Sequence, residues 1–294
     1  MNVKRALFLI VTVALIAMLV ITSIVVLVRG PRESSVELVD KNTDGTLLVN
    51  DLYEGKMTIP YFDIPTCSYK PDDFSENKGV VTYEGGDSYV GINVNSQMGE
   101  IDWQQVADSG VDYAMIRVGW REYGKGRIQA DPQFETNIQG ALDAGLPVGV
   151  YFFSKAITDA EAEEEASFVL DKIRSFSVTY PVVFYWRFDY KDDGSLNEEI
   201  RTAGCNGDQV TGFINTFCAR VSMAGYTVGF YCDKTMGYEK LDLSKLKSYD
   251  MWYSEYRAAP SFYYDFKMWQ YTAAGTVPGI EGDVPFTLSL KKYA

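Results

Sequence analysis

The chain of 294 residues contains no histidine, so it lacks the usual neutral-pH base and the commonest metal ligand of proteins. Its four cysteines form no Cys-x-x-Cys pair, which argues against a zinc ribbon. Cys205 and Cys218 could form a disulfide in an oxidising compartment or remain buried thiols, and the sequence leaves both readings open, as it does for Cys67 and Cys232. We expect no metal and no other cofactor, so any hydrolytic reaction would have to use carboxylates.

Net positive charge is also lacking, because the formal net charge is −13. Such a surface repels phosphates, so we expect no nucleic acid partner. A net charge away from zero is common on soluble surfaces and needs no special function. Hydrophobic residues make up 47% of the chain and aromatic residues 14%. This is a globular composition with enough flat rings to line a surface groove.

An uncharged hydrophobic run covers residues 6–28. At 1.5 Å per residue it is long enough to cross a hydrocarbon core of roughly 30 Å. A signal peptide has a shorter apolar region and a small-x-small cleavage site, and neither is evident. We therefore predict an uncleaved, single-pass anchor over residues 1–28 in the cell membrane. The N-terminus is expected inside, and the following domain extracytoplasmic.

Residues 29–88 are interpreted as a spacer or lead-in. Residues 40–45 form a turn cluster, and Pro60, Pro65 and Pro71 interrupt the short apolar pieces that follow. Tyr61 and Phe62 are unusual residues for a linker, so part of this segment is expected to pack on the main domain.

From residue 89 to residue 294 the pattern alternates between strands and helices. Strands are expected at 90–94, 113–118, 148–153, 180–187, 227–231, 251–256, 266–271 and 284–290. Helices are expected to begin near Asp102, Asp131, Thr158 and Asp208, with Thr158 and Glu161 forming a capping box. Eight nearly continuous apolar strands predict an α/β fold, an irregular (β/α) TIM-like barrel preceded by one transmembrane helix and a spacer. In such barrels the functional residues lie at the carboxyl ends of the strands.

Several motifs occur in a specific order along this domain. They are GINVN at 91–95, IDW at 101–103, VDYA at 111–114, VGVYFFS at 148–154, MWQYT at 268–272 and VPGIEG at 277–282. Together they resemble glycoside hydrolase family 25, the Chalaropsis-type lysozymes, over about residues 89–290. Residues 47–67 are also similar to the lead-in of membrane-anchored members from Firmicutes-like bacteria. The resemblance implies a muramidase barrel that hydrolyses the β-1,4 bond between N-acetylmuramic acid and N-acetylglucosamine in peptidoglycan.

The resemblance fails at the residues that carry the family's chemistry. Four strand-end positions at which the family has acids are occupied here by Asn93, Tyr185, Arg187 and Pro285. Glycoside cleavage needs a proton donor at the leaving oxygen and a carboxylate near the oxocarbenium-like centre. A permanently charged arginine can serve as neither. The sequence therefore predicts a pseudoenzyme whose catalytic acids have been replaced.

Three other carboxylates are candidate replacements. Asp189 follows the strand at 180–187, Glu255 ends the strand at 251–256, and Asp233 follows the strand at 227–231. An active muramidase that uses these displaced carboxylates is the alternative to a pseudoenzyme. The simpler interpretation makes Asp189 a solvated loop acid near Lys191. Arg187 would then form an ion pair with Asp189 or Glu255, or bind an anion through its planar guanidinium.

Aromatic residues near the strand ends are candidates for stacking on sugar rings, and we expect about half of them to face the groove. They are Tyr151, Phe153, Tyr185, Tyr231, Trp252, Trp269 and Tyr271. All of these except Tyr271, together with Arg187, form the predicted substrate-binding set. The leading hypothesis is a protein that binds peptidoglycan glycan or a cell-wall protein. A non-binding scaffold, with Tyr185 and Arg187 filling a closed groove, is the other alternative.

Overall fold

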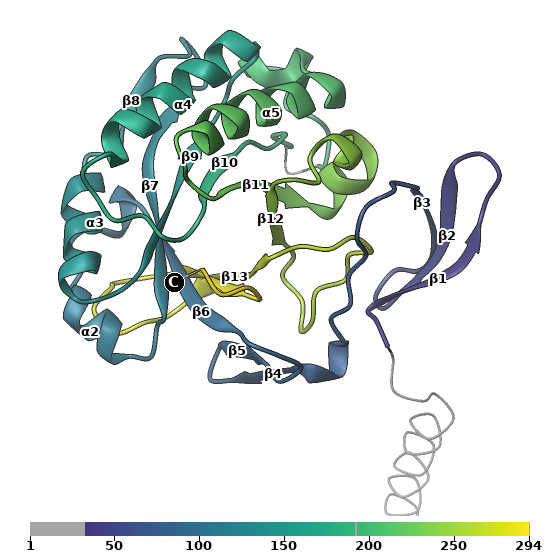
Figure 1. Cartoon of the computed structure of the whole chain (residues 1–294), viewed down its shortest axis with the longest axis horizontal. Helices are drawn as coiled ribbons and strands as arrows, with labels where there is room; N and C mark the ends of the chain where they lie inside the picture. The colour runs from purple at the N-terminus through teal and green to yellow at the C-terminus, as the bar shows by residue number, and fades with distance from the viewer. Residues whose placement is uncertain (1–32, 192, 294) are drawn as a thin grey trace, which may run out of the picture. The chain divides into compact units, whose positions relative to one another are not determined.

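Eight strands close into a barrel in the computed structural model, which describes residues 33–191 and 193–293 (Figure 1). They are β6 (Tyr89–Val94), β7 (Tyr113–Arg121), β9 (Val148–Phe153), β10 (Val182–Tyr185), β11 (Val228–Asp233), β12 (Asp250–Ser254), β13 (Met268–Gly275) and β14 (Val284–Ser289). Apolar residues of these strands, such as Ile92, Ile116 and Phe184, are fully buried. The predicted irregular (β/α) barrel is confirmed.

The last strand departs from the parallel arrangement of the others. Adjacent strands from β6 to β13 run parallel, whereas β14 is antiparallel to both β13 and β6 and closes the barrel between them. The parallel arrangement typical of such barrels therefore does not extend to β14. The physical reason is the short connection between β13 and β14, which contains the Pro278-Gly279 turn and no helix, and parallel pairing requires a long crossover. A further short strand that the sequence did not predict, β8 (Ile128–Ala130), pairs antiparallel with β7.

Four helices follow the first four barrel strands and surround one side of the barrel (Figure 1). They are α2 (Trp103–Asp108), α3 (Phe134–Asp143), α4 (Asp159–Ile173) and α5 (Gly207–Met223). The Thr158 hydroxyl accepts from the Glu161 N–H, but the Glu161 carboxylate accepts from Ile157 rather than completing a capping box. Helix α5 has a complete capping box, in which Asn206 and Gln209 bond reciprocally.

Single turns complete the connections. Four are 3₁₀ turns, namely η1 (Pro71–Asp73), η2 (Ser96–Met98), η3 (Arg201–Gly204) and η5 (Leu243–Lys245). The turn η4 (Met236–Lys240) is π-helical.

Residues 34–88, which the sequence analysis treats as a spacer, contain five strands. β1 (Val36–Lys41), β2 (Thr46–Asp51) and β3 (Gly55–Pro60) form an antiparallel sheet, and β4 (Phe74–Asn77) pairs with β5 (Val80–Tyr83). These strands contact the part of the barrel that lacks covering helices. The Tyr53 hydroxyl bonds the backbone of Ala259 at 3.0 Å, and the Tyr69 hydroxyl donates to the Phe266 carbonyl at 2.9 Å. The segment is thus built into the same compact unit as the barrel.

The predicted membrane segment at residues 6–28 lies outside the described residues. Within the described ranges, none of the helices has the length and apolar character needed to cross a bilayer. All four cysteines are free thiols, and Cys218 is buried in the core while Cys205 is partly exposed.

A buried ion pair joins the end of β7 to helix α4. The Arg121 Nε atom lies 2.6 Å from Glu165 Oε1, and both residues are almost fully buried. Arg121 also donates to the Gly126 carbonyl and to Glu164. Burial raises the pKa of Glu165 to about 7, although bonds from Ser154 and Arg121 oppose the shift.

This shifted pKa predicts a pH-dependent stability. Because the folded chain holds the Glu165 proton more tightly than the unfolded chain, the stabilisation is complete below about pH 4.5 and is lost as pH rises through about 7. Between pH 4.5 and a pH above 7, the contribution of Glu165 to the unfolding free energy should fall by roughly 3 kcal/mol. Urea unfolding of wild type and Glu165→Gln between pH 4 and 8 measures it. Glu165→Gln should lose this part of the pH dependence, whereas the control Glu164→Gln, on the exposed side of α4, should retain it. Identical stability–pH profiles for wild type and both variants would contradict the prediction.

Candidate functional site

A pocket of about 570 Å³ lies at the carboxyl ends of the parallel strands, where β14 begins. The strand direction explains its position, because the ends of β6, β7, β9, β10, β12 and β13 meet at one rim. Fourteen residues line it: Asn93, Asn95, Ser96, Gln97, Arg117, Trp120, Tyr123, Tyr151, Phe153, Tyr185, Arg187, Trp252, Gln270 and Pro285.

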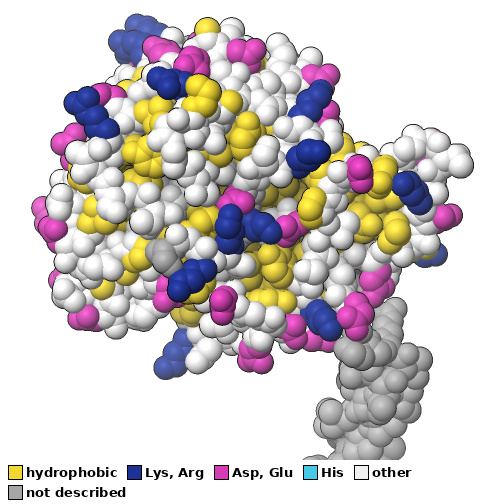
Figure 2. Space-filling view, in the orientation of Figure 1, with side chains coloured by type: hydrophobic (Ala, Val, Ile, Leu, Met, Phe, Trp, Pro, Cys, Tyr) yellow, Lys and Arg dark blue, Asp and Glu magenta, His cyan; other side chains and the backbone are white. Residues whose placement is uncertain are grey.

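None of these fourteen lining residues is an aspartate or a glutamate. The lining instead includes two arginines, Arg117 and Arg187, in a chain whose formal net charge is −13. Asp131 and Asp189 contact these arginines without lining the pocket themselves, and Figure 2 shows other Asp and Glu side chains spread over the face in view. The four positions at which the family resemblance expects acids, now Asn93, Tyr185, Arg187 and Pro285, all line this one pocket.

Asn93, at the end of β6, places a neutral amide where the family resemblance expects an acid. The Trp252 indole N–H donates to the Thr287 hydroxyl at 3.1 Å, and that hydroxyl in turn donates to Asn93 Oδ1 at 3.1 Å. Because the indole nitrogen can only donate, the Thr287 hydroxyl accepts from it and keeps its own proton for Asn93 Oδ1. The Asn93 Nδ2 group is buried and has no partner among the described residues. Gln270, on β13, also lines the pocket, and its Oε1 atom is likewise buried with no hydrogen-bond partner among the described residues.

Tyr185 lies in an aromatic cluster. Its ring stacks on Tyr231 with centroids 3.8 Å apart and contacts Phe153, Tyr151 and Trp252 at 5.4–6.1 Å. Burial, together with the neighbouring Tyr231, raises the pKa of the Tyr185 hydroxyl well above its usual value. Tyr185 therefore presents a neutral ring to the pocket and cannot serve as a carboxylate would.

The two arginines of the pocket differ in their partners. Arg117 Nε lies 2.8 Å from Asp131 Oδ2, and the Arg117 side chain is only 15% exposed. Arg187 is 48% exposed, and its Nε lies 3.9 Å from Asp189 Oδ1. The other oxygen of Asp189 binds the ammonium of Lys155, which is completely buried. Asp189 is therefore not the solvated acid that was expected near Lys191, because the buried Lys155 from the end of β9 lies against it.

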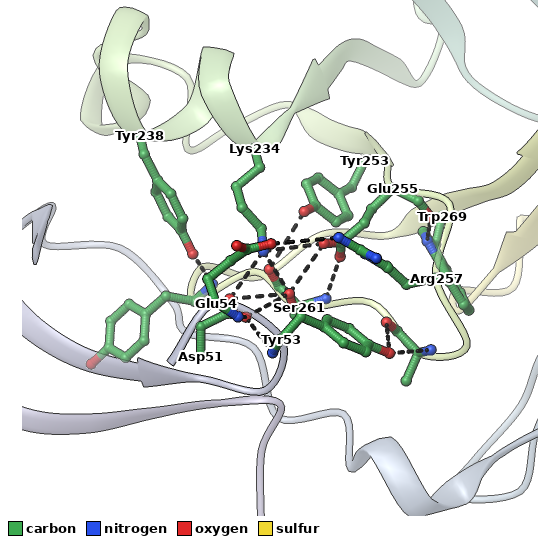
Figure 3. A network of polar contacts seen from close by, with 12 residues as sticks. Asp51, Tyr53, Glu54, Lys234, Tyr238, Tyr253, Glu255, Arg257, Ser261 and Trp269 are labelled. Carbon is green, nitrogen blue, oxygen red and sulfur yellow. Dashed lines mark hydrogen bonds and ion pairs between the residues drawn. The ribbon is translucent and has the colours of Figure 1, made fainter. Parts of the chain in front are cut away.

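Glu255 belongs to a second buried network, away from the pocket lining (Figure 3). Lys234, which follows β11, lies between Asp51 of β2 and Glu255, with Nζ 3.0 Å from Asp51 Oδ2 and 3.1 Å from Glu255 Oε1. Ser261 bonds all three side chains, and its backbone N–H also donates to Glu255. Two of the displaced carboxylates proposed from the sequence, Asp189 and Glu255, thus have lysine partners.

The structure brings together part of the predicted substrate-binding set. Four of the seven aromatic residues line the pocket, namely Tyr151, Phe153, Tyr185 and Trp252. Tyr231 stacks behind Tyr185, and Trp269 is fully buried with its indole N–H bonded to the Glu255 carbonyl at 2.8 Å. Tyr271 bonds the Val81 N–H, away from the pocket.

Other lining residues were missed. Trp120 and Tyr123 lie at the end of β7, which extends to Arg121 rather than to residue 118 as predicted. A longer strand would have placed both rings at the rim. Among the residues that the structure describes, no cluster of three or more Cys, Asp or Glu side chains is placed to hold a metal ion.

The fold and the pocket define this protein as an α/β barrel whose candidate site is formed by the carboxyl ends of its strands. The sequence model of Glycosyl hydrolases family 25 matches residues 92–280. This match covers more than half of the chain, and the chain belongs to that family.

Known proteins agree with this assignment. The chain is 26% identical over 193 residues to an autolytic lysozyme of Clostridium acetobutylicum, covering 65% of this chain and 53% of that relative. It is 24% identical over 204 residues to Lysozyme M1 of Streptomyces globisporus, covering 66% and 65%. The matches thus span about half to two thirds of these relatives. The modular autolysin LytC of Streptococcus pneumoniae, solved with a synthetic peptidoglycan ligand, has a similar fold, with a TM-score of 0.59, 20% identity, and coverage of 84% of this chain and 57% of that chain.

The Lys234 network predicts a specific stability defect. Lys234→Met leaves Asp51 and Glu255 buried without their cation, which should lower the unfolding free energy by about 3 kcal/mol at pH 7. The loss should shrink in Lys234→Met/Glu255→Gln, because one of the two uncompensated charges is removed. Lys245→Met, at an exposed ion pair, should change stability by less than about 1 kcal/mol. Urea unfolding of the full-length chains measures these values, and a single Lys234 variant as stable as the Lys245 control would refute the prediction.

Proposed function

We propose that this protein is a pseudoenzyme that binds peptidoglycan glycan without cleaving it. The observation that carries the proposal is the absence of any carboxylate among the fourteen residues that line the pocket. Both roles in glycoside cleavage, proton donation and stabilisation of the oxocarbenium-like centre, need an acidic group at the scissile bond. The residues at the family's acid positions supply an amide, a phenol, a guanidinium and a proline instead.

Glycan as the ligand is supported by the family and by the pocket lining. Both curated relatives are named lysozymes, and the similar autolysin was solved with a peptidoglycan ligand. The rings of Tyr123, Tyr151, Phe153 and Tyr185 line the pocket and offer flat surfaces for sugar rings. Arg187 adds a cation, and Tyr231 holds the Tyr185 ring from behind. A cell-wall protein remains the other class of partner for the same surface.

An active muramidase with displaced carboxylates is less well supported. Two of the three candidate acids have an ammonium against them, Lys155 for Asp189 and Lys234 for Glu255. None of the three carboxylates is among the residues that line the pocket, where a scissile bond would have to lie. A closed, non-binding scaffold is also disfavoured, because about 570 Å³ of pocket remains open beside Tyr185 and Arg187.

We further propose that the protein is anchored in the cell membrane through residues 6–28, with the barrel on the extracytoplasmic side. The support is the uncharged apolar run itself, whose length matches a bilayer core. This location would hold the pocket next to the cell wall, where peptidoglycan lies.

Binding without cleavage is directly testable. The full-length chain, purified in a mild non-ionic detergent, should sediment with insoluble peptidoglycan and produce no clearing in a zymogram of cell walls. Tyr123→Ala should weaken sedimentation roughly five-fold, or about 1 kcal/mol, because this ring is 43% exposed at the pocket. Tyr190→Ala is the matched control, since that ring is 45% exposed outside the pocket lining. Clearing at a rate typical of family members would refute the proposal, and so would a failure to sediment.

Restoring the family's acids tests whether their loss causes the inactivity. The variant Asn93→Asp/Tyr185→Asp/Arg187→Glu/Pro285→Asp places four carboxylates in the intact pocket and should gain measurable lytic activity. Zymography checks this gain, with circular dichroism to confirm that the variant is folded. A folded but inert variant would show that the pocket lacks more than its acids and would favour the scaffold.

A further inference from the structure

Arg187 is the more loosely paired of the two arginines that line the pocket. Asp131 lies 2.8 Å from Arg117, whereas the nearest Asp189 oxygen is 3.9 Å from Arg187. Across the described residues, the Arg187 side chain makes no hydrogen bond to a protein acceptor. Its terminal N–H groups are therefore available to an oxyanion entering from solvent.

Two cations and two acids surround this part of the pocket. Lys155 and Arg187 are two cations that share the single carboxylate of Asp189, and Lys155 is in direct contact with it. Asp233 also faces this region from the end of β11. Its carboxylate accepts from the Met236 N–H at 2.8 Å, and burial raises its pKa, with the field of Arg187 opposing the shift. Neither acid lies among the residues that line the pocket.

Two buried amide groups provide an independent sign of a ligand. Asn93 Nδ2 is a donor and Gln270 Oε1 an acceptor, both line the pocket, and neither has a partner within the described part of the chain. The two residues are only 4% and 6% exposed. Buried polar groups are normally paired, so these two call for a partner that supplies one acceptor and one donor. The acetamido group of an N-acetylated sugar supplies both.

We propose that the pocket selects a carboxylate-bearing, N-acetylated glycan, with the carboxylate bound to Arg187 and the acetamido group to Asn93 and Gln270. The inference rests on the proposed glycan-binding function and specifies its ligand. A guanidinium binds a carboxylate through two parallel hydrogen bonds, which adds geometric selectivity to the charge. A glutamate at position 187, as in the family pattern, offers no cation to the same ligand. The replacement that removes the proton donor thus also adds a cation to the pocket.

Two parts of peptidoglycan can supply the carboxylate. One is the lactyl group of muramoyl sugars, which is free only after amide hydrolysis has removed the stem peptide. The other is a carboxylate of the stem peptide itself. Both sources offer the same group to Arg187, and differently prepared strands distinguish them.

The experiment measures binding of the full-length chain, in detergent, to three soluble glycan preparations by calorimetry. The first is peptide-free strands, the second is peptide-bearing strands, and the third is peptide-free strands whose carboxylates have been converted to neutral methylamides. Wild type should bind at least one of the two carboxylate-bearing preparations about ten-fold or more tightly than the neutralised strands. The tighter of those two identifies the source of the carboxylate.

Variants of Arg187 test whether this side chain causes the preference for carboxylate-bearing strands over neutralised strands. Arg187→Gln should lose it, and Arg187→Lys should retain part of it because the charge remains without the planar fork. Arg174→Gln, at an exposed ion pair on the far end of α4, should behave as wild type. Circular dichroism checks that each variant is folded.

The possible failures are distinguishable. Equal binding of all three preparations by wild type, or undiminished discrimination by Arg187→Gln, overturns the carboxylate inference and leaves glycan binding standing. Displacement of the glycan by a polyol phosphate polymer at lower concentration also overturns the carboxylate assignment. Binding to none of the preparations overturns the inference together with the proposed function.

Discussion

The common direction of the first seven barrel strands is the constraint on which the pocket depends. Because β6 to β13 run parallel, their carboxyl ends meet at one rim, and residues far apart in the sequence become neighbours there. The antiparallel β14 enters the same rim at its beginning, which brings Pro285 to the pocket beside Asn93 and Arg187. Any substitution at these strand ends therefore alters a single shared surface while the barrel wall stays unchanged.

The sequence predicted the barrel and the gathering of the four replaced positions, because strand periodicity and ordered motifs are local signals. It did not predict what depends on tertiary contacts. Asp189 pairs with Lys155 and Glu255 pairs with Lys234. Each lysine follows a different strand from its partner, so no local sequence pattern predicts these pairs. The five N-terminal strands were also missed, since prolines and turns obscured short segments that the barrel stabilises.

At two of the positions where the family has acids, the side chains fit the pocket without carrying a negative charge. Asn93 has almost the outline of an aspartate, and Thr287 donates to its oxygen as it would to a carboxylate. Tyr185 replaces an acid with a ring that completes an aromatic cluster. Several carboxylates in one confined space repel one another, so their removal relieves a cost that active enzymes accept for function. The proposed loss of catalysis therefore need not lower the stability of the fold.

The attachment of β2 to the barrel through Asp51, Lys234 and Ser261 has a mechanical meaning (Figure 3). With Tyr53 and Tyr69 bonded to the same side, the N-terminal sheet cannot swing freely about the barrel. A pulling force applied at Ser34 would act through this buried network on the ends of β11 and β12. It would not merely extend a flexible linker. The sheet and the barrel therefore respond to such a force as one compact body.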